Sequence, residues 1–404
     1  MSLPLAGVKV LEVASHVFVP IGGGVLTEWG AEVIKIEHPV TGDPYRGLVT
    51  SGLHKDYNGI DPSFQFTNRG KQSVAVDLKT AEGRAIVHRL AAQCDVFLTN
   101  FRPAARRKLE IEYQDILAQN PSIVYVRGTG YGARGPDAQR GGYDGAAYWS
   151  RAGFGAVLTP PTSEYPVMQR PAFGDVVGGL TIAGAIAAAL YRRATTGEPA
   201  LVDVSLLGMG MWQLQPDIVH AKLEDGAVRH AYDRKAVSNP LSNTYRTRDG
   251  RFIVLMMLDA DRYWGDFCEV VDRPDLASDA RFADMAARKA NARACIEILD
   301  AVFAARDYAM WLEDLKPAKG VWSPFQTPRE IHDDPQVAAN DYLADVEMIN
   351  GDSLTLVTSP VQFDEIPAKP IRAPEHGEHT ETVLFEMGMS WEEISALKDR
   401  NVIG

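Results

Sequence analysis

A single aspartate stands where carboxylate chemistry is easily arranged. Asp175 directly precedes a long apolar stretch, which is typical of a buried helix. Gly174 lets the chain bend just before the carboxylate, and Gly178 and Gly179 leave the next turn open to a bulky ligand. We expect the helix N-terminus to hold this carboxylate ionised and therefore nucleophilic. The alternative is an ordinary N-cap, in which the carboxylate accepts backbone N–H groups.

Basic residues form a second group of candidates. The segment Asn100–Pro103 follows a predicted strand, and Arg106, Arg107 and Lys108 come next. Ligands of open α/β sheets bind at the carboxyl ends of strands, and clustered arginine and lysine suit phosphate groups. Asn68–Lys71, before another predicted strand, presents the same pattern. For each basic residue the alternative is a solvated helix face.

Glycine-rich segments complete the candidates. Gly22–Gly24 follows the first predicted strand and Glu37 ends the second, but the GxGxxG spacing of a dinucleotide site is missing. Close packing at a helix start is the favoured interpretation. The stretch from Tyr131 to Gly142 is either a ligand loop or a plain connection. Histidines and carboxylates show no metal spacing and no GxSxG elbow occurs, so we predict neither a metal site nor a serine hydrolase.

Short β-branched runs alternate with helical patterns through the first half of the chain. The predicted strands are Val8–Val13, Val33–Ile36, Ser73–Leu78, Asp95–Leu98, Ile123–Val126 and, further on, Leu201–Val204. Pro20–Trp29 and Ala81–Ala92 are predicted helices, the second capped by Thr80. This alternation predicts an α/β fold with a Rossmann-like, doubly wound parallel sheet.

The later part of the chain has a different pattern. Tyr245–Leu258 reads as a hairpin with its turn at Asp249–Gly250, and Arg262–Val271 and Ala290–Ala305 read as helices. Charged or proline-punctuated linkers are expected at Glu224–Lys235 and Thr327–Asp334. We therefore predict a large Rossmann-like domain whose first part is 1–225, a smaller α+β domain in 226–330, and a C-terminal segment, 331–404, that returns to the large domain.

The composition is that of a globular protein. The 404 residues are 46% hydrophobic and 23% charged, and the formal net charge of -12 argues against nucleic acid as the main partner. Three cysteines without CxxC spacing suit a reducing compartment. The apolar stretch Val176–Tyr191 is shorter than the roughly 20 residues of a membrane span. We expect a cytoplasmic protein without a membrane partner.

Taken in order, the segments resemble the class III CoA-transferase family of the CaiB/BaiF type, which includes formyl-CoA transferase and alpha-methylacyl-CoA racemase. The resemblance covers nearly the whole chain. It is carried by Leu5–Glu12, Gly30–Glu37, Gly42–Pro44, Asn68–Lys71, Asn100–Pro103, Asn120–Pro121, Gly174–Asp175, Asp249–Arg251 and Arg281–Phe282. Each piece alone is short, but their order over this length is specific.

The resemblance implies transfer of CoA from an acyl-CoA to a carboxylic acid through a covalent aspartyl intermediate on Asp175. It implies no tightly bound cofactor, CoA thioesters as substrates, and an interlocked homodimer. Carried over by position, the CoA contacts are Val17, Phe18, His38, Asn68, Arg69, Gly70, Lys71, Asn100, Phe101, Arg102, Lys108, Arg140, Gly141, Gly142 and Tyr143.

Several positions depart from the family pattern. His38 stands where a stronger cation is usual, Ala104 replaces a glycine, and the small domain has no four-glycine loop, which argues against oxalate as acceptor. The racemase branch has a histidine beside an aspartate where this chain has Tyr143 and Asp144. A neutral tyrosine is a poor base near pH 7, so a transferase is favoured. A racemase and a non-catalytic acyl-CoA binding protein are the alternatives.

Overall fold

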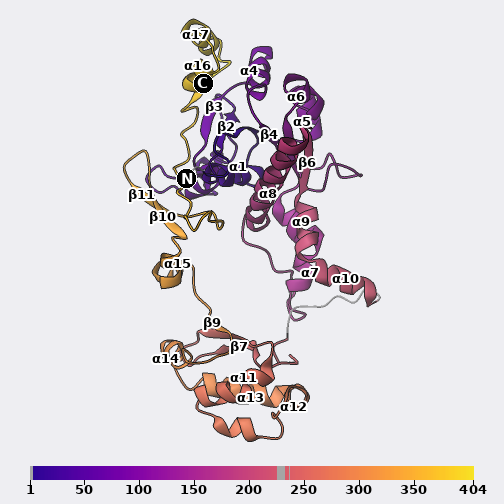
Figure 1. Ribbon diagram of the computed structural model, residues 1–404, viewed down its shortest axis with the longest axis vertical. Helices are drawn as coiled ribbons and strands as arrows, with labels where there is room; N and C mark the ends of the chain where they lie inside the picture. Colours follow the sequence, from indigo (N-terminus) through magenta and orange to yellow (C-terminus); the bar gives the residue numbers. More distant parts are fainter. Residues whose placement is uncertain (1–2, 225–232, 236) are drawn as a thin grey trace. The chain divides into compact units, whose positions relative to one another are not determined.

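The computed structural model describes residues 3–224, 233–235 and 237–404 of the chain (Figure 1). Contacts divide the chain into two compact units, Met1–Arg229 with Gln336–Gly404, and His230–Pro335. Each unit has its own apolar core. The predicted linker Glu224–Lys235 lies largely outside the described residues.

A six-stranded parallel sheet forms the centre of the first unit. Its strands are β1 (Lys9–Val13), β2 (Glu32–Glu37), β3 (Gln72–Ala75), β4 (Val96–Thr99), β5 (Val124–Thr129) and β6 (Ala200–Ser205). The order across the sheet is β3-β2-β1-β4-β5-β6, with every pairing parallel. All six predicted strands are therefore confirmed, and with the intervening helices they make a mixed α/β fold.

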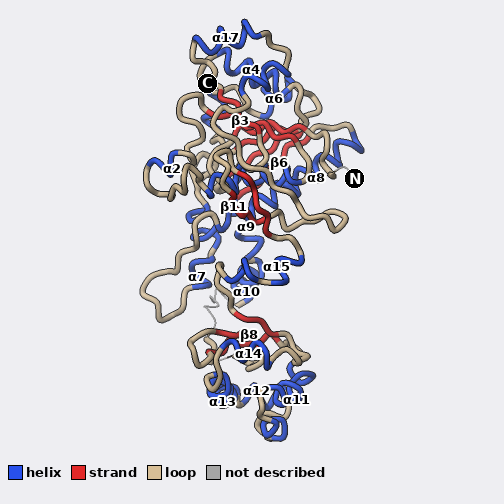
Figure 2. The backbone as a smooth tube through the Cα atoms, turned by 90° about the vertical axis from the view of Figure 1, so that its left-hand side faces the viewer, coloured by secondary structure: helices blue, strands red, loops and turns tan. Residues whose placement is uncertain are grey.

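Helices cover both faces of this sheet. Because successive strand residues point to opposite sides, the strands contribute apolar side chains to a core on each face. One face packs on α1 (Phe18–Glu28) and α8 (Phe173–Thr196), and its core contains Val10 and Val124. The other packs on α4 (Ala81–Ala91), α6 (Tyr113–Gln119), α16 (Thr380–Glu386) and α17 (Trp391–Asp399). Figure 2 shows the strands with α4 and α6 on one side and α8 on the other. The C-terminal helices thus complete the second face.

Glycines bring α1 and α8 into close contact. A Cβ atom on Gly22 would lie 2.8 Å from Cγ2 of Ile182, and one on Gly179 would collide with Ile21. Gly22 therefore serves close helix packing, as the sequence favoured, although it lies in the middle of α1 rather than at its start. Among the described residues α8 is the one helix long and apolar enough to cross a membrane, but half of its most apolar window is buried inside this unit. That burial is typical of a core helix.

Shorter elements surround the sheet of the first unit. They are α2 (Gly47–Thr50), α3 (Pro62–Asn68), α5 (Pro103–Lys108), the π-helix η1 (Gly145–Ser150), α7 (Phe154–Leu158), α9 (Leu206–Gln213), α10 (Gln215–Leu223), α15 (Pro335–Ala339), and a hairpin of β10 (Leu343–Glu347) and β11 (Ser353–Val357). Of these, α5 and η1 begin beside the loops that carry the candidate residues.

The second unit is a small α+β fold. Three antiparallel strands, β7 (Ser242–Arg246), β8 (Phe252–Met256) and β9 (Trp322–Pro324), pair in that order. Its main helices are α11 (Ala260–Val270), α12 (Met285–Ala290), α13 (Ala292–Phe303) and α14 (Tyr308–Asp314). The predicted hairpin is confirmed, with Gly250 at a left-handed φ of 84° in its turn. The two predicted helices correspond to α11 and α13.

Candidate active site

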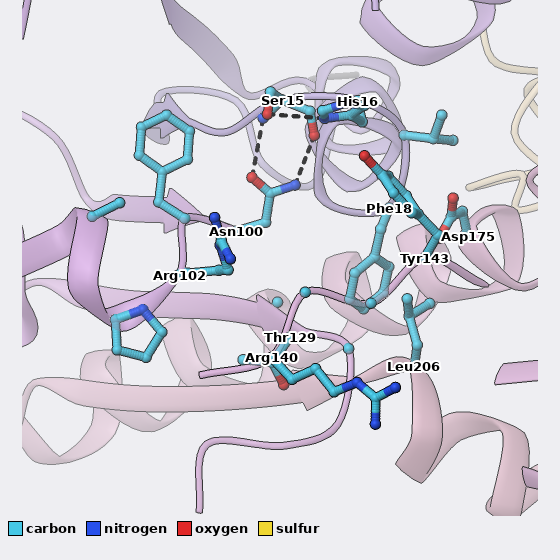
Figure 3. A pocket seen from close by; sticks show the side chains of 18 of the residues that line it. Ser15, His16, Phe18, Asn100, Arg102, Thr129, Arg140, Tyr143, Asp175 and Leu206 are labelled. Carbon is cyan, nitrogen blue, oxygen red and sulfur yellow. Dashed lines mark hydrogen bonds between the residues drawn. The ribbon is translucent and has the colours of Figure 1, made fainter. Parts of the chain in front are cut away.

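The strand order places a natural ligand crevice between β1 and β4. From β1 the chain continues to β2 on one side, whereas β4 lies on the other, and ligands of open α/β sheets bind where the order reverses. A cavity of about 540 Å³ lies there (Figure 3). It is lined by Ser15, His16, Val17, Phe18, Asn100, Phe101, Arg102, Pro103, Ala105, Gly128, Thr129, Gly130, Ala138, Arg140, Gly141, Gly142, Tyr143, Asp175 and Leu206.

Asp175 enters this cavity from the first turn of α8. It is the third residue of the helix, which follows Ala172 at a left-handed φ of 63°. The helix start has no side-chain cap, so the N-cap interpretation of Asp175 is wrong. Gly174 is required here, because a Cβ atom on it would lie 2.5 Å from Cγ of Tyr148. Close approach of this turn to the Tyr148 ring sets the direction of the Asp175 side chain.

Burial determines the charge state of this carboxyl. Only 8% of Asp175 is exposed, and burial, followed by the nearby Asp144 carboxylate, raises its pKa to about 8. Asp144 accepts hydrogen bonds from the N–H groups of Gly145 at 2.8 Å and Gly174 at 3.3 Å. The expectation that the helix N-terminus keeps Asp175 ionised is therefore wrong near neutral pH. Desolvation, and after it the like charge of Asp144, favours the protonated form.

The cavity brings together much of the predicted CoA-binding set. Val17, Phe18, Asn100, Phe101, Arg102, Arg140, Gly141, Gly142 and Tyr143 all line it with Asp175. Asn100 also holds the crevice together, because its side chain accepts from the N–H of Ser15 at 3.1 Å and donates to the Ser15 carbonyl at 2.7 Å. These two bonds, dashed in Figure 3, join the loops after β1 and β4.

Arg102 and Arg140 are the cations that line this cavity. Figure 3 shows Arg102 at the end of the cavity away from Asp175. Lys108 ends α5 and is not among the lining residues. Arg106 is buried and donates to the Phe101 carbonyl at 2.7 Å, so its charge supports the loop rather than a ligand.

The segment Asn68–Lys71 does not line the cavity. The Lys71 ammonium is buried and lies 2.8 Å from the Glu12 carboxylate, with Asn68 Oδ1 at 3.0 Å. Arg69 forms an ion pair of 2.5 Å with Glu28. These charges and the Asn68 amide are engaged inside the fold, and the CoA contacts expected of Asn68, Arg69, Gly70 and Lys71 stay a prediction.

His38 is likewise used by the fold. Its Nδ1 accepts hydrogen bonds from the N–H groups of Val40 at 3.2 Å and Thr41 at 3.3 Å, and its carbonyl accepts from His376 at 2.9 Å. These bonds shape the turn after β2, and His38 is outside the cavity lining. The CoA contact expected of His38 stays a prediction.

Sequence reasoning missed several lining residues. Ser15 and His16 directly precede the predicted contacts at Val17 and Phe18, and Leu206 follows β6. Their position immediately after a strand was a usable signal, because the carboxyl ends of parallel strands meet at one edge of the sheet. Asp144, which touches the start of α8, gave no signal of its own beyond its place beside Tyr143.

Comparison with known proteins assigns the class. The sequence matches CoA-transferase family III over residues 5–380, and the chain belongs to this family. It is 32% identical to (R)-2-hydroxy-4-methylpentanoate CoA-transferase of Clostridioides difficile, covering 99% of both chains. It is 31% identical to cinnamoyl-CoA:phenyllactate CoA-transferase of Clostridium sporogenes, covering 98% of this chain and 97% of the relative. The resemblance drawn from the motifs is confirmed, and these relatives support general CoA transfer.

Solved structures agree with this assignment. A CAIB/BAIF family protein from Brucella suis superimposes with a TM-score of 0.82 at 28% identity, covering 96% of this chain and 100% of that one. An aspartate-to-alanine variant of Rv3272 from Mycobacterium tuberculosis gives a TM-score of 0.80 at 29% identity, covering 95% and 99%. The mixed α/β fold is thus that of the family.

Proposed function

We propose that the protein moves CoA from an acyl-CoA thioester to a carboxylic acid through covalent intermediates on Asp175. The observation that carries this proposal is a buried carboxyl, 8% exposed, that lines the cavity at the sheet's switch point. Within the described part of the chain it neither caps α8 nor pairs with a cation. A carboxyl group that is buried without a hydrogen-bonding role at the helix end or a paired cation lowers the stability of the fold. Carboxyl groups kept in such an environment are typical of catalytic nucleophiles.

The chemistry needs only carboxylates and a thiolate. The Asp175 carboxylate attacks the thioester carbonyl and the C–S bond breaks. CoA leaves as thiolate, and a mixed anhydride of Asp175 and the acyl group remains. The thiolate then attacks the aspartyl carbonyl, which releases the donor acid and forms an aspartyl-CoA thioester. An acceptor carboxylate repeats the two steps in reverse, so Asp175 is regenerated and a new acyl-CoA departs. Covalent catalysis divides one difficult exchange into easier ones.

The rest of the cavity suits a long, two-ended ligand. Arg102 and Arg140 supply positive charge for phosphate groups, while Phe18, Tyr143 and Leu206 give apolar surface. Binding energy from the nucleotide end can hold the thioester against Asp175. The two relatives are named for (R)-2-hydroxy-4-methylpentanoate and phenyllactate. Both acids carry a hydroxyl group at C2 and a branched or aromatic side chain, and we propose acids of this class as substrates.

An isotope-exchange assay tests the proposed function. An acyl-CoA donor is mixed with a ¹³C-labelled 2-hydroxy acid, and labelled acyl-CoA is followed by mass spectrometry. The wild-type protein should form it, and Asp175→Asn, which keeps the shape of the side chain, should not. Labelled product from the variant at a wild-type rate would contradict the role of Asp175. Deuterium uptake at the α-carbon without CoA exchange would instead support the racemase alternative.

We also propose a homodimer. The consecutive helices α8, α9 and α10 expose many apolar side chains. Monomeric proteins rarely expose large apolar patches. The exposed side chains are Val176, Val177, Tyr191, Met211, Trp212, Ile218, Val219 and Leu223. A dimer in which a second copy covers these side chains should persist on dilution. Its sedimentation coefficient should therefore stay that of a dimer at nanomolar concentration. A folded, active monomer under those conditions would contradict this proposal.

A further inference from the structure

His16 stands in the same cavity as Asp175, and nothing in the proposed chemistry uses it. It is the third residue after β1, at the carboxyl end of the sheet. Its ring packs edge-on against Tyr143, with ring centroids 5.7 Å apart and an interplanar angle of 67°. The imidazole therefore has a fixed direction within the cavity rather than a free one.

The backbone of His16 is held in a conformation that histidine rarely adopts. Its φ is 66°, in the left-handed region. Its N–H donates to Oδ1 of Asp43 at 3.0 Å, and Oδ2 of Asp43 lies 2.8 Å from the Lys35 ammonium. Lys35 also pairs with Glu12 at 3.1 Å, and the side chains of all three charged residues are at most 1% exposed. A buried ionic network thus fixes a strained residue at the cavity, which is common at functional sites.

One ring nitrogen of His16 is left for a ligand. Nδ1 lies 3.1 Å from Oγ of Ser15, whereas Nε2 makes no hydrogen bond within residues 3–224, 233–235 and 237–404. Two other polar side chains of the cavity are engaged: the Asn100 amide binds Ser15, and Thr129 Oγ1 accepts from the Gly132 N–H at 3.0 Å. Nε2 is therefore well placed to recognise a polar group on a bound acid.

We propose that His16 is a specificity-determining residue whose Nε2 hydrogen-bonds a hydroxyl group at C2 of the acid bound beside Asp175. This inference rests on the proposed function. An imidazole nitrogen either donates to or accepts from a hydroxyl, depending on its tautomer. A site built around such a bond rejects the analogue that lacks the hydroxyl, because the protein group is then left unpaired. His16 takes no part in bond making or breaking.

Two substitutions distinguish the roles of the two ring nitrogens of His16. In His16→Asn the amide nitrogen or oxygen takes the place of Nδ1, so the Ser15 contact survives and nothing reaches the position of Nε2. Asparagine also tolerates a left-handed backbone, which protects folding. In His16→Gln the terminal amide reaches the position of Nε2. The matched pair thus differs mainly in whether a hydrogen-bonding group extends into the cavity.

The test compares kcat/KM for 2-hydroxy-4-methylpentanoate and 4-methylpentanoate as acceptors, with one acyl-CoA donor held constant. The wild-type protein should prefer the hydroxy acid by about 100-fold or more. His16→Asn should reduce this ratio to within roughly threefold of one, and His16→Gln should retain most of it. A wild-type ratio near one, or an unchanged ratio in His16→Asn, would overturn the proposal.

The donor half-reaction keeps this proposal distinct from the one it rests on. The wild-type protein, given an acyl-CoA donor whose acid has no hydroxyl group at C2, should release the donor acid and form the aspartyl-CoA adduct before any acceptor is added. Loss of this adduct in the wild-type protein would refute the proposed function. Its presence together with an unchanged acceptor ratio would refute the role of His16 alone.

Discussion

The carboxyl groups of Asp144 and Asp175 are both buried where α8 begins, each with 8% exposure. Asp144 accepts from the N–H of Gly174, the residue before Asp175, and so orients the first turn. Burial, and after it the charge of Asp144, raises the pKa of Asp175 to about 8. Asp175, the proposed nucleophile, is thus kept largely protonated near pH 7, and the proposed chemistry requires that it first lose this proton.

The pH dependence of the donor reaction should follow from this relationship. We expect kcat/KM for the acyl-CoA to rise with pH up to about 8 and then level off, because only the ionised carboxylate attacks the thioester. Asp144→Asn removes the like charge, so the rise of kcat/KM with pH should occur at lower pH in this variant. A profile that is flat from about pH 6 to about pH 9 would contradict the assignment.

Stability should depend on pH for the same reason. The unfolded carboxyl titrates near its ordinary value of 3.8, whereas the folded one titrates near 8. Between these values the unfolded chain loses a proton that the folded chain keeps, so the contribution of Asp175 to the free energy of unfolding falls as pH rises and is lowest above about 8. Asp175→Asn should therefore be more stable than wild type at about pH 9, by on the order of a few kcal/mol.

Urea denaturation at two pH values measures this difference. Near pH 4 the advantage of Asp175→Asn should nearly disappear, since the folded and unfolded carboxyls then differ little in free energy. An equal difference at both pH values would show that the substitution acts through packing rather than through charge.

The cations of the loop after β4 should differ in their effect on CoA affinity. Arg102 lines the cavity, so Arg102→Gln should raise KM for the acyl-CoA far more than it lowers kcat. A charge-assisted contact of about 1.5–3 kcal/mol corresponds to roughly a 10- to 100-fold change in KM. Lys108→Gln, at the last residue of the helix that Arg102 precedes and outside the lining, is the control and should change KM little. The opposite ranking in steady-state kinetics would contradict this assignment.

The sheet could be predicted because its signals are local. Each strand is a short β-branched run, and Thr80 caps α4 by accepting from the Gly83 N–H, as predicted. The turn at Gly250 is another local signal, since its left-handed φ suits glycine. Such features depend on neighbouring residues, so pattern and propensity suffice to find them.

The electrostatics of the site depend on residues far apart in the chain and could not be predicted in this way. Lys71 is a plausible phosphate ligand until Glu12, distant in sequence, is seen to neutralise it in the core. The charge state of Asp175 likewise depends on burial and on Asp144. The residue type suggested a role in each case, but only the packing decides whether a charge faces a ligand or the protein.

Intact-mass spectrometry of the protein after incubation with an acyl-CoA alone tests the central claim most directly. The covalent mechanism predicts an increase equal to one CoA minus one water, located on Asp175 by peptide mapping, absent from Asp175→Asn, and discharged when a carboxylic acid is added. The result that would contradict the account is steady CoA transfer with the adduct on another residue, or CoA transfer that continues at the wild-type rate in Asp175→Asn.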